Sequence, residues 1–227
     1  MTTDHHFQLV DDGTESASLR ERKKARTRTA LIEVSQRLFE KKGYAQTTLE
    51  EICAEVEITP QTLLRYFDSK AALALAPMTS PLEQLKAYLA DPDRSVDAIA
   101  TWRRFVTLEA TEASEPTSAT TRKYLDNLAG FREWVDRDPV LVAMGAEAER
   151  SLRLAVAAAL AHDRGAAADD LHSTMVAALL VAGRTAVWDR WLEHGRARDS
   201  LVDDQLAVVD YAIASLAPTD DPLSNPT

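Results

Sequence analysis

Apolar residues recur at the spacing of a helix face along most of this chain of 227 residues. Ala, Leu, Arg, Glu and Asp are abundant, and no segment alternates β-branched and polar residues as a half-buried strand does. Prolines, glycines and short polar clusters interrupt the helical pattern at Gly43, Pro60, Pro77 with Pro81, Asp91-Pro92-Asp93, Pro116, Asp138-Pro139, Gly165 and Gly195. The pattern therefore predicts an all-α fold of about nine helices.

The pattern predicts two helices in the N-terminal part of the chain. The longer covers about residues 20–42, with Gly43 placed to cap it. A shorter helix follows, for which Thr47 or Thr48 is a suitable N-cap, and it ends by Glu57. The inward faces of the two helices consist of Leu31, Ile32, Ser35, Leu38 and Phe39, and of Leu49, Ile52, Cys53 and Val56.

After a turn at Glu57 and Ile58, Thr59 is placed to cap a third helix with Pro60 at its first position. Its inward residues are Leu63 and Phe67, its outward residues are Gln61, Thr62, Arg65 and Tyr66, and Ser69 starts a fourth helix. A short helix that follows a tight turn and exposes hydrogen-bonding side chains is what major-groove reading by a helix-turn-helix requires. On spacing alone, an ordinary three-helix packing unit with a solvated polar face is the alternative.

Charge is distributed unevenly along the chain. The formal net charge is −10, yet residues 20–42 carry nine basic and three acidic side chains, a net charge of +6. Residues 77–227 carry a net charge of −9. This asymmetry predicts one face that meets phosphate and a remainder that phosphate repels.

Several classes of protein are excluded. No stretch approaches the roughly 20 apolar residues of a membrane span, and the N-terminus lacks a signal-peptide pattern, so we expect a cytoplasmic protein without a membrane partner. The single cysteine, Cys53, excludes an intramolecular disulfide and a cysteine-based metal cluster. There is no glycine-rich phosphate loop, nucleophile elbow or histidine-carboxylate motif, so neither an enzyme with catalytic residues nor a cofactor or metal is expected.

A resemblance to a known family rests on residues 28–73, which include LFEKKGYAQTTLEEICAEVEITPQTLLRYFDSKAAL. This segment resembles the N-terminal DNA-binding domain of the TetR family of bacterial transcription regulators. The similarity extends over three helices and the start of the fourth. It implies a homodimer that binds a double-stranded DNA operator and responds to a small-molecule effector.

The resemblance also implies which residues contact DNA. Gln61, Thr62, Arg65 and Tyr66 would lie on the recognition helix, which Thr59 caps, while Thr48 and Lys70 would each bind a phosphate. Basic residues near the start of the first helix, among them Lys24 and Arg26, are expected to reach the DNA backbone or minor groove.

Two residues depart from the family pattern. Glu57 stands where a turn glycine is usual, at a position that often needs positive φ and therefore costs another residue about 1 kcal/mol. Leu64 replaces a tyrosine that often contacts phosphate, so it is expected to pack or to touch a sugar or a thymine methyl group. Both changes concern operator affinity and leave the fold unaffected.

Residues 171–194 and 200–217 predict two long helices joined near Gly195. Such a hairpin would bury its apolar stripe against its twin in a homodimer. The candidate interface residues are Leu179, Val187, Trp188, Trp191, Leu206, Val209 and Ile213; burial within one subunit is the alternative for each. A two-fold dimer places its recognition helices about 34 to 36 Å apart, which predicts a near-palindromic operator.

The helices near residues 95–113, 118–136 and 139–162 would enclose the ligand cavity that the resemblance implies. The residues able to line it are Trp102, Phe105, Tyr124, Phe131, Trp134 and Met144, with Glu109 or His172 as polar groups that orient the ligand. An ordinary place in the core is the alternative for each.

The chain is thus predicted to contain a disordered tail at residues 1–18, a helix-turn-helix domain at 19–76, a ligand-binding and dimerisation domain at 77–217, and a disordered tail at 218–227. The predicted function is a TetR-like regulator, a repressor that a small molecule releases from its operator. Activation or corepression would use the same linkage with the sign reversed. The alternative is a helical adaptor of this fold that has lost specific DNA binding.

Overall fold

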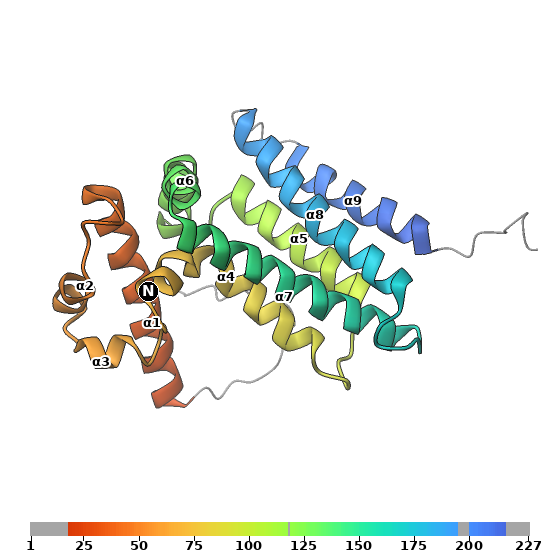
Figure 1. The fold of residues 1–227 in the computed structure, drawn as a ribbon, viewed down its shortest axis with the longest axis horizontal. Coiled ribbons are helices and arrows are strands. Elements are labelled where there is room, and N and C mark those ends of the chain that lie inside the picture. Colours follow the sequence, from red (N-terminus) through yellow and green to blue (C-terminus); the bar gives the residue numbers. More distant parts are fainter. Residues whose placement is uncertain (1–17, 118, 195–199, 217–227) are drawn as a thin grey trace, which may run out of the picture. The chain divides into compact units, whose positions relative to one another are not determined.

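The computed structural model describes residues 18–117, 119–194 and 200–216, which contain nine helices and no strand. The helices, shown in Figure 1, are α1 (Leu19–Lys42), α2 (Leu49–Val56), α3 (Pro60–Leu63), α4 (Lys70–Leu89), α5 (Ala98–Ser114), α6 (Ala119–Arg137), α7 (Pro139–Asp163), α8 (Leu171–Glu193) and α9 (Leu201–Leu216). The predicted all-α fold is therefore confirmed. The predicted tails and the region around Gly195 lie outside the described residues.

The helices form two compact units. The first contains the chain up to Tyr88 together with Glu115–Ser151, and the second contains Leu89–Ser114 and the chain from Leu152 onward. The first unit thus joins α6 and the start of α7 to the N-terminal helices, while the second is built from α5, the rest of α7, α8 and α9.

Helix α1 is fixed at both ends. Ser18 and Glu21 form a capping box at its start, and Gly43 ends it with a φ of +89°, which is favourable only for glycine. The helix contacts α2 and α6. Its buried residues Leu31, Leu38 and Phe39 contribute to the core of the first unit.

One helix boundary was predicted wrongly. Pro77 and Pro81 were expected to interrupt the chain, yet both lie inside α4, which continues to Leu89. Each proline removes one backbone donor, but apolar residues before and after them, such as Leu73 and Leu85, are fully buried. Burial of α4 outweighs the local cost, so the predicted domain boundary between residues 76 and 77 falls inside this helix.

In the second unit α9 packs against both α5 and α8, and the three helices lie side by side in Figure 1. Gly183 lets α8 approach α9 closely, because a Cβ there would lie 2.5 Å from the Cγ1 of Val208 and one of the two side chains would have to shift. Trp102, Phe105 and Leu180 are fully buried in this unit. The predicted pairing of the last two helices is therefore observed.

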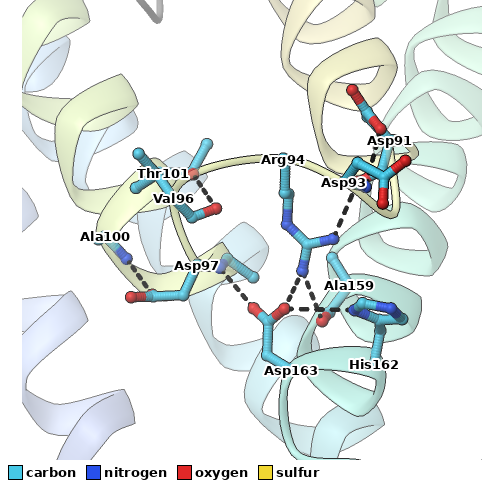
Figure 2. Close-up of polar contacts among 11 residues, drawn as sticks. Asp91, Asp93, Arg94, Val96, Asp97, Ala100, Thr101, Ala159, His162 and Asp163 are labelled. Carbon is cyan, nitrogen blue, oxygen red and sulfur yellow. Dashed lines mark hydrogen bonds and ion pairs between the residues drawn. The ribbon is translucent and has the colours of Figure 1, made fainter.

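A buried arginine fixes the loop before α5 to the end of α7, as Figure 2 shows. The side chain of Arg94 is only 3% exposed and is paired with Asp163. Its guanidinium also donates to the carbonyl oxygens of Asp91 at 3.2 Å and of Ala159 at 3.1 Å. The second carboxylate oxygen of Asp163 accepts the N–H of Ala98 at 2.6 Å, which satisfies a donor at the start of α5.

Candidate DNA-binding site

Helix α2 begins at a capping box. The hydroxyl of Thr48 accepts the N–H of Glu51 at 3.3 Å, and the Glu51 carboxylate accepts the N–H of Thr48 at 2.8 Å. Thr47, the other candidate cap, is buried and donates its hydroxyl to the carbonyl of Gly43 at 2.9 Å. Thr48 is exposed at the N-terminus of α2, and its O–H bonds with the Glu51 carboxylate, so it would have to turn from Glu51 to donate to a phosphate.

The turn after α2 takes the left-handed conformation that glycine favours. Glu57 has φ of 58° and ψ of 43°, and it is the one non-glycine residue with positive φ in the described chain. The N–H groups of Glu57 and Ile58 both donate to the carbonyl of Cys53, which closes the helix. The side chain of Glu57 is exposed. The sequence correctly indicated strain here, and the turn keeps its usual geometry.

We expect Glu57→Gly to raise the free energy of unfolding by about 1 kcal/mol, because glycine adopts positive φ without the steric cost that a Cβ brings. Denaturant unfolding of the two proteins measures the difference. Glu57→Ala is the control, since it removes the carboxylate and keeps the Cβ; its effect should stay within about 0.5 kcal/mol. An equal gain for both substitutions would show that the charge is the cause, contrary to this account.

Residues 59–67, here called the recognition segment, begin with a capped helix and continue as a turn. Thr59 accepts the N–H of Thr62 at 3.1 Å, and Pro60 occupies the first helical position. Helix α3 ends at Leu63, and its backbone bonding continues through the N–H of Tyr66, which donates to the carbonyl of Leu63 at 2.8 Å. The regular helix is thus shorter than the resemblance implied, with Arg65 and Tyr66 in the turn that follows it.

Two buried residues hold the recognition segment to the core and leave its polar side outward. Leu63 is fully buried and Phe67 is 5% exposed, as predicted. The remaining side chains face solvent or are half-buried, namely Gln61, Thr62, Leu64, Arg65 and Tyr66. Leu64 is 48% exposed, so its side chain is available to an apolar group of DNA instead of completing the core.

The basic residues of the first unit differ in their surroundings. Lys24 and Arg26 are exposed on α1, in the turns that follow the Ser18 capping box. Arg28 is held inside the unit, because it donates to the Ser80 hydroxyl at 2.9 Å and lies 4.8 Å from the centre of the Phe67 ring. Lys70 lies with its ammonium nitrogen 4.2 Å from the centre of the Tyr44 ring.

Cys53 lies on the buried face of α2 and is 2% exposed, and burial raises the pKa of its thiol. A buried cysteine of raised pKa behaves as a small apolar residue. This placement agrees with the inward face predicted for α2.

The predicted interface residues of α8 and α9 differ in how far their side chains are buried. Trp191 and Val209 are buried within the unit, whereas Leu179, Val187, Trp188, Leu206 and Ile213 are half-buried. Three residues outside the predicted set have larger exposed fractions, which are Leu171 at 71%, Met175 at 64% and Tyr211 at 70%. The sequence does contain a sign of these exposed apolar residues: α8 is apolar on nearly all sides, which is typical of a helix that is covered on more than one face.

Helix α8 is also the one described helix that is long and apolar enough to cross a membrane. Only 28% of its most apolar window is buried within the chain. A single helix of this kind is weak support for a membrane span, and an unpaired subunit interface shows the same composition.

The predicted ligand residues fall in both units. In the second unit, Trp102 and Phe105 are fully buried with ring centres 5.8 Å apart. Glu109 accepts two hydrogen bonds of 2.7 Å from Arg184, whose guanidinium lies 5.6 Å from the Phe105 ring. His172 is half-buried, and its Nε2 has no hydrogen-bond partner in the part of the chain that the structure describes.

The other ligand candidates lie in the first unit. The ring centres of Phe131 and Trp134 are 4.6 Å apart, and Met144 is half-buried. The side chain of Tyr124 lies outside the described part of α6. Trp134 also contacts Phe39 and Tyr44, with ring centres 5.8 and 5.3 Å away. The structure therefore joins Trp134 of α6 to Phe39 of α1 and to Tyr44, contacts that the sequence pattern did not predict.

Sequence comparison identifies relatives of the N-terminal segment. Residues 31–76 match the family described as "Bacterial regulatory proteins, tetR family". A segment of 71 residues is 44% identical to the HTH-type transcriptional regulator TcmR of Streptomyces glaucescens. This match spans 31% of the present chain and 31% of the length of TcmR.

Two solved structures are similar over most of the chain. The SmeT–triclosan complex has a TM-score of 0.56 at 20% identity, with 89% of this chain and 100% of that chain covered. Thermus thermophilus FadR, a TetR-family transcriptional repressor in complex with lauroyl-CoA, has a TM-score of 0.54 at 16% identity, covering 88% and 100%. At these identities the structures show a common fold, which is the predicted helix-turn-helix domain followed by a larger helical region.

Proposed function

Because residues 31–76 match the family described as bacterial regulatory proteins of the tetR family, we propose that the chain is a cytoplasmic transcription regulator that binds a palindromic operator as a homodimer. One observation carries the proposal. Buried Leu63 and Phe67 anchor a recognition segment whose Gln61 and Arg65 are exposed. The guanidinium of Arg65 makes no hydrogen bond or ion pair within the part of the chain that the structure describes, which leaves its five N–H donors for guanine and phosphate.

The exposed apolar face of α8 supports the homodimer. Met175 and Leu171 are one helical turn apart on this helix and are each more than half exposed. Pairing with a second copy would bury this face, and a closed two-fold dimer places two identical recognition segments on one operator.

We expect Met175→Glu to weaken the dimer by about 3 kcal/mol, or roughly 100-fold, because the dimer would bury two unpaired carboxylates. Sedimentation velocity across a concentration series measures the change, and operator affinity should fall with it. The control is Leu154→Glu, which introduces the same charge at a site on α7 that is 52% exposed. A Met175→Glu protein that dimerises like the control would exclude α8 from the interface.

A small-molecule effector is proposed from the second unit and from the names of two fold relatives, one bound to triclosan and one to lauroyl-CoA. Trp102 is fully buried, and its indole N–H lacks a hydrogen-bond partner among the described residues. A ligand acceptor at this position would satisfy it. The guanidinium of Arg184, which is paired with Glu109, lies 5.6 Å from the centre of the Phe105 ring and places a charged pair beside these rings.

The proposed mechanism is a shift between two states of the dimer. One state holds the recognition segments at operator spacing, and the effector prefers the other, so it lowers DNA affinity by its differential binding free energy. The chain then acts as a repressor that the effector releases. Operator titrations with and without a metabolite extract of the source cells test this step, and an unchanged affinity in every extract fraction would contradict it.

A helical adaptor without specific DNA binding is the second candidate, and the features that favour it are Glu57 and exposed Leu64 in the recognition motif. The two functions differ in salt dependence. A regulator retains sites at physiological salt that it binds at least about 10³-fold more tightly than random DNA, whereas non-specific binding is weak and falls steeply with salt. Competition of one fragment against random DNA distinguishes them.

A further inference from the structure

The ring of Tyr44, directly after the end of α1, lies between the DNA-binding helices and α6. It meets Phe39 edge-on with ring centres 5.3 Å apart. The Trp134 ring stacks on it, with a centre distance of 5.3 Å and an interplanar angle of 9°. Phe39 and Phe131 are buried, and each contacts the Trp134 ring, so the position of Tyr44 depends on α6 as well as on α1.

The same Tyr44 ring supports the ammonium group of Lys70 at the start of α4, 4.2 Å from the ring centre. Asp138 adds a negative charge nearby, and its own carboxylate accepts the N–H of Val140 at 2.9 Å at the start of α7. Burial and the Asp138 charge raise the pKa of Tyr44. Burial lowers the pKa of Lys70, while Asp138 and Glu51 oppose that shift and Lys42 adds to it.

We propose that Trp134 is a positioning residue for DNA binding, because its stack on Tyr44 holds the ring that presents the Lys70 ammonium to a DNA phosphate. This inference rests on the proposed function. A lysine ammonium has three N–H donors, so contact with a ring face leaves donors for an anion. An ordered Lys70 also loses less side-chain freedom on binding than a freely rotating one.

The position of Trp134 gives this role a structural basis. It lies in α6, outside the helix-turn-helix, and Tyr44 contacts both Trp134 and Lys70. Loss of the Trp134 indole would leave the Tyr44 ring without its stacked neighbour and would free the Lys70 side chain. An ordinary core role predicts a change in stability alone.

Operator affinity measured as a function of salt concentration distinguishes a positioning role of Trp134 from a role in core packing alone. The probe is the DNA fragment that the wild-type protein selects from a random duplex library. Each neutralised phosphate contributes roughly 0.9 to the slope of log K against log salt, so Lys70→Ala should reduce the slope by about 1.8 for a dimer. Trp134→Ala should reduce the slope by at least about half as much and lower the affinity roughly tenfold.

Two variants separate the stack from general stability. Trp134→Phe keeps a ring against Tyr44 and should restore the slope, and the double variant Lys70→Ala/Trp134→Ala should bind within about twofold of Lys70→Ala alone. Leu85→Ala truncates a fully buried residue of the same unit and should leave the slope unchanged. If Trp134→Ala does not fold, Tyr44→Leu replaces it and should show the same loss of slope.

Failure of this inference differs from failure of the proposed function. A wild-type protein that selects no fragment would overturn both. The positioning role alone would be overturned if the wild-type protein bound its fragment and either Trp134→Ala or Lys70→Ala kept the full wild-type salt slope.

Discussion

Substitution of Arg65 by alanine should lower operator affinity by roughly 2–6 kcal/mol, or about 30-fold to 10⁴-fold. A bidentate contact of arginine with guanine is worth about 1–3 kcal/mol, and a dimer makes it in both half-sites. Arg65 is exposed in the turn after α3, beside the buried anchor Phe67. Fluorescence anisotropy with the selected operator measures the loss.

Two variants show whether Arg65 reads a base. Arg65→Lys keeps the charge but cannot form the planar bidentate contact, so it should lose sequence discrimination while retaining most of the salt slope. Arg104→Ala removes an exposed arginine from α5 and should bind like wild type. If Arg65→Lys kept full discrimination between the operator and its mismatched versions, Arg65 would be a phosphate contact and its assignment to the major groove would be wrong.

Substitution of Asp163 by alanine should reduce the free energy of unfolding by about 3 kcal/mol, because it leaves a buried guanidinium without its carboxylate. Arg94, its partner, is 3% exposed, while the Asp163 side chain is 25% exposed. The same change removes the acceptor of the Ala98 N–H at the start of α5. Denaturant unfolding gives the difference.

The contribution of Asp163 should also depend on pH. Burial acts to raise the pKa of its carboxyl, but the Ala98 N–H and the Arg94 guanidinium outweigh burial, so the pKa is lowered in the folded protein. A lowered folded pKa gives stability that is fully present above the unfolded value of about 3.9 and is lost as pH falls through the folded value. The difference between wild type and Asp163→Asn should therefore be largest near neutral pH and shrink below about pH 4.

Asp93→Ala is the control for both experiments, because Asp93 lies exposed in the same loop. It should change stability by less than about 0.5 kcal/mol at any pH. If Asp163→Ala were as mild as this control, the Arg94 guanidinium would have to be solvated, in contradiction to its burial.

The N-terminal helices could be predicted because their signals are local. Thr48 and Thr59 cap the helices that follow them, and Glu57 adopts the positive φ that its place after α2 requires. These features depend on residues within one or two turns, and a single sequence contains them. The length of α3 depends less on such signals, and its regular part ends at Leu63, earlier than the resemblance implied.

The remaining features depend on contacts between distant segments. Pro77 and Pro81 are helix-breaking residues by local rules, yet burial along α4 keeps them helical. Trp134 is separated from Tyr44 by most of the first unit's sequence, and no periodicity indicates that their rings stack. The sequence likewise cannot tell which apolar residues of α8 are covered within the chain and which, like Met175, remain exposed.

Selection of genomic DNA fragments from the source organism at physiological salt, by the wild-type protein and by Arg65→Ala in parallel, shows whether the chain reads a DNA sequence. We expect the wild-type protein to retain a few fragments that share a near-palindrome with half-sites about one helical turn apart, and Arg65→Ala to retain none of them. Retention without a common sequence, or the same set for both proteins, would contradict a regulator that reads DNA through its helix-turn-helix.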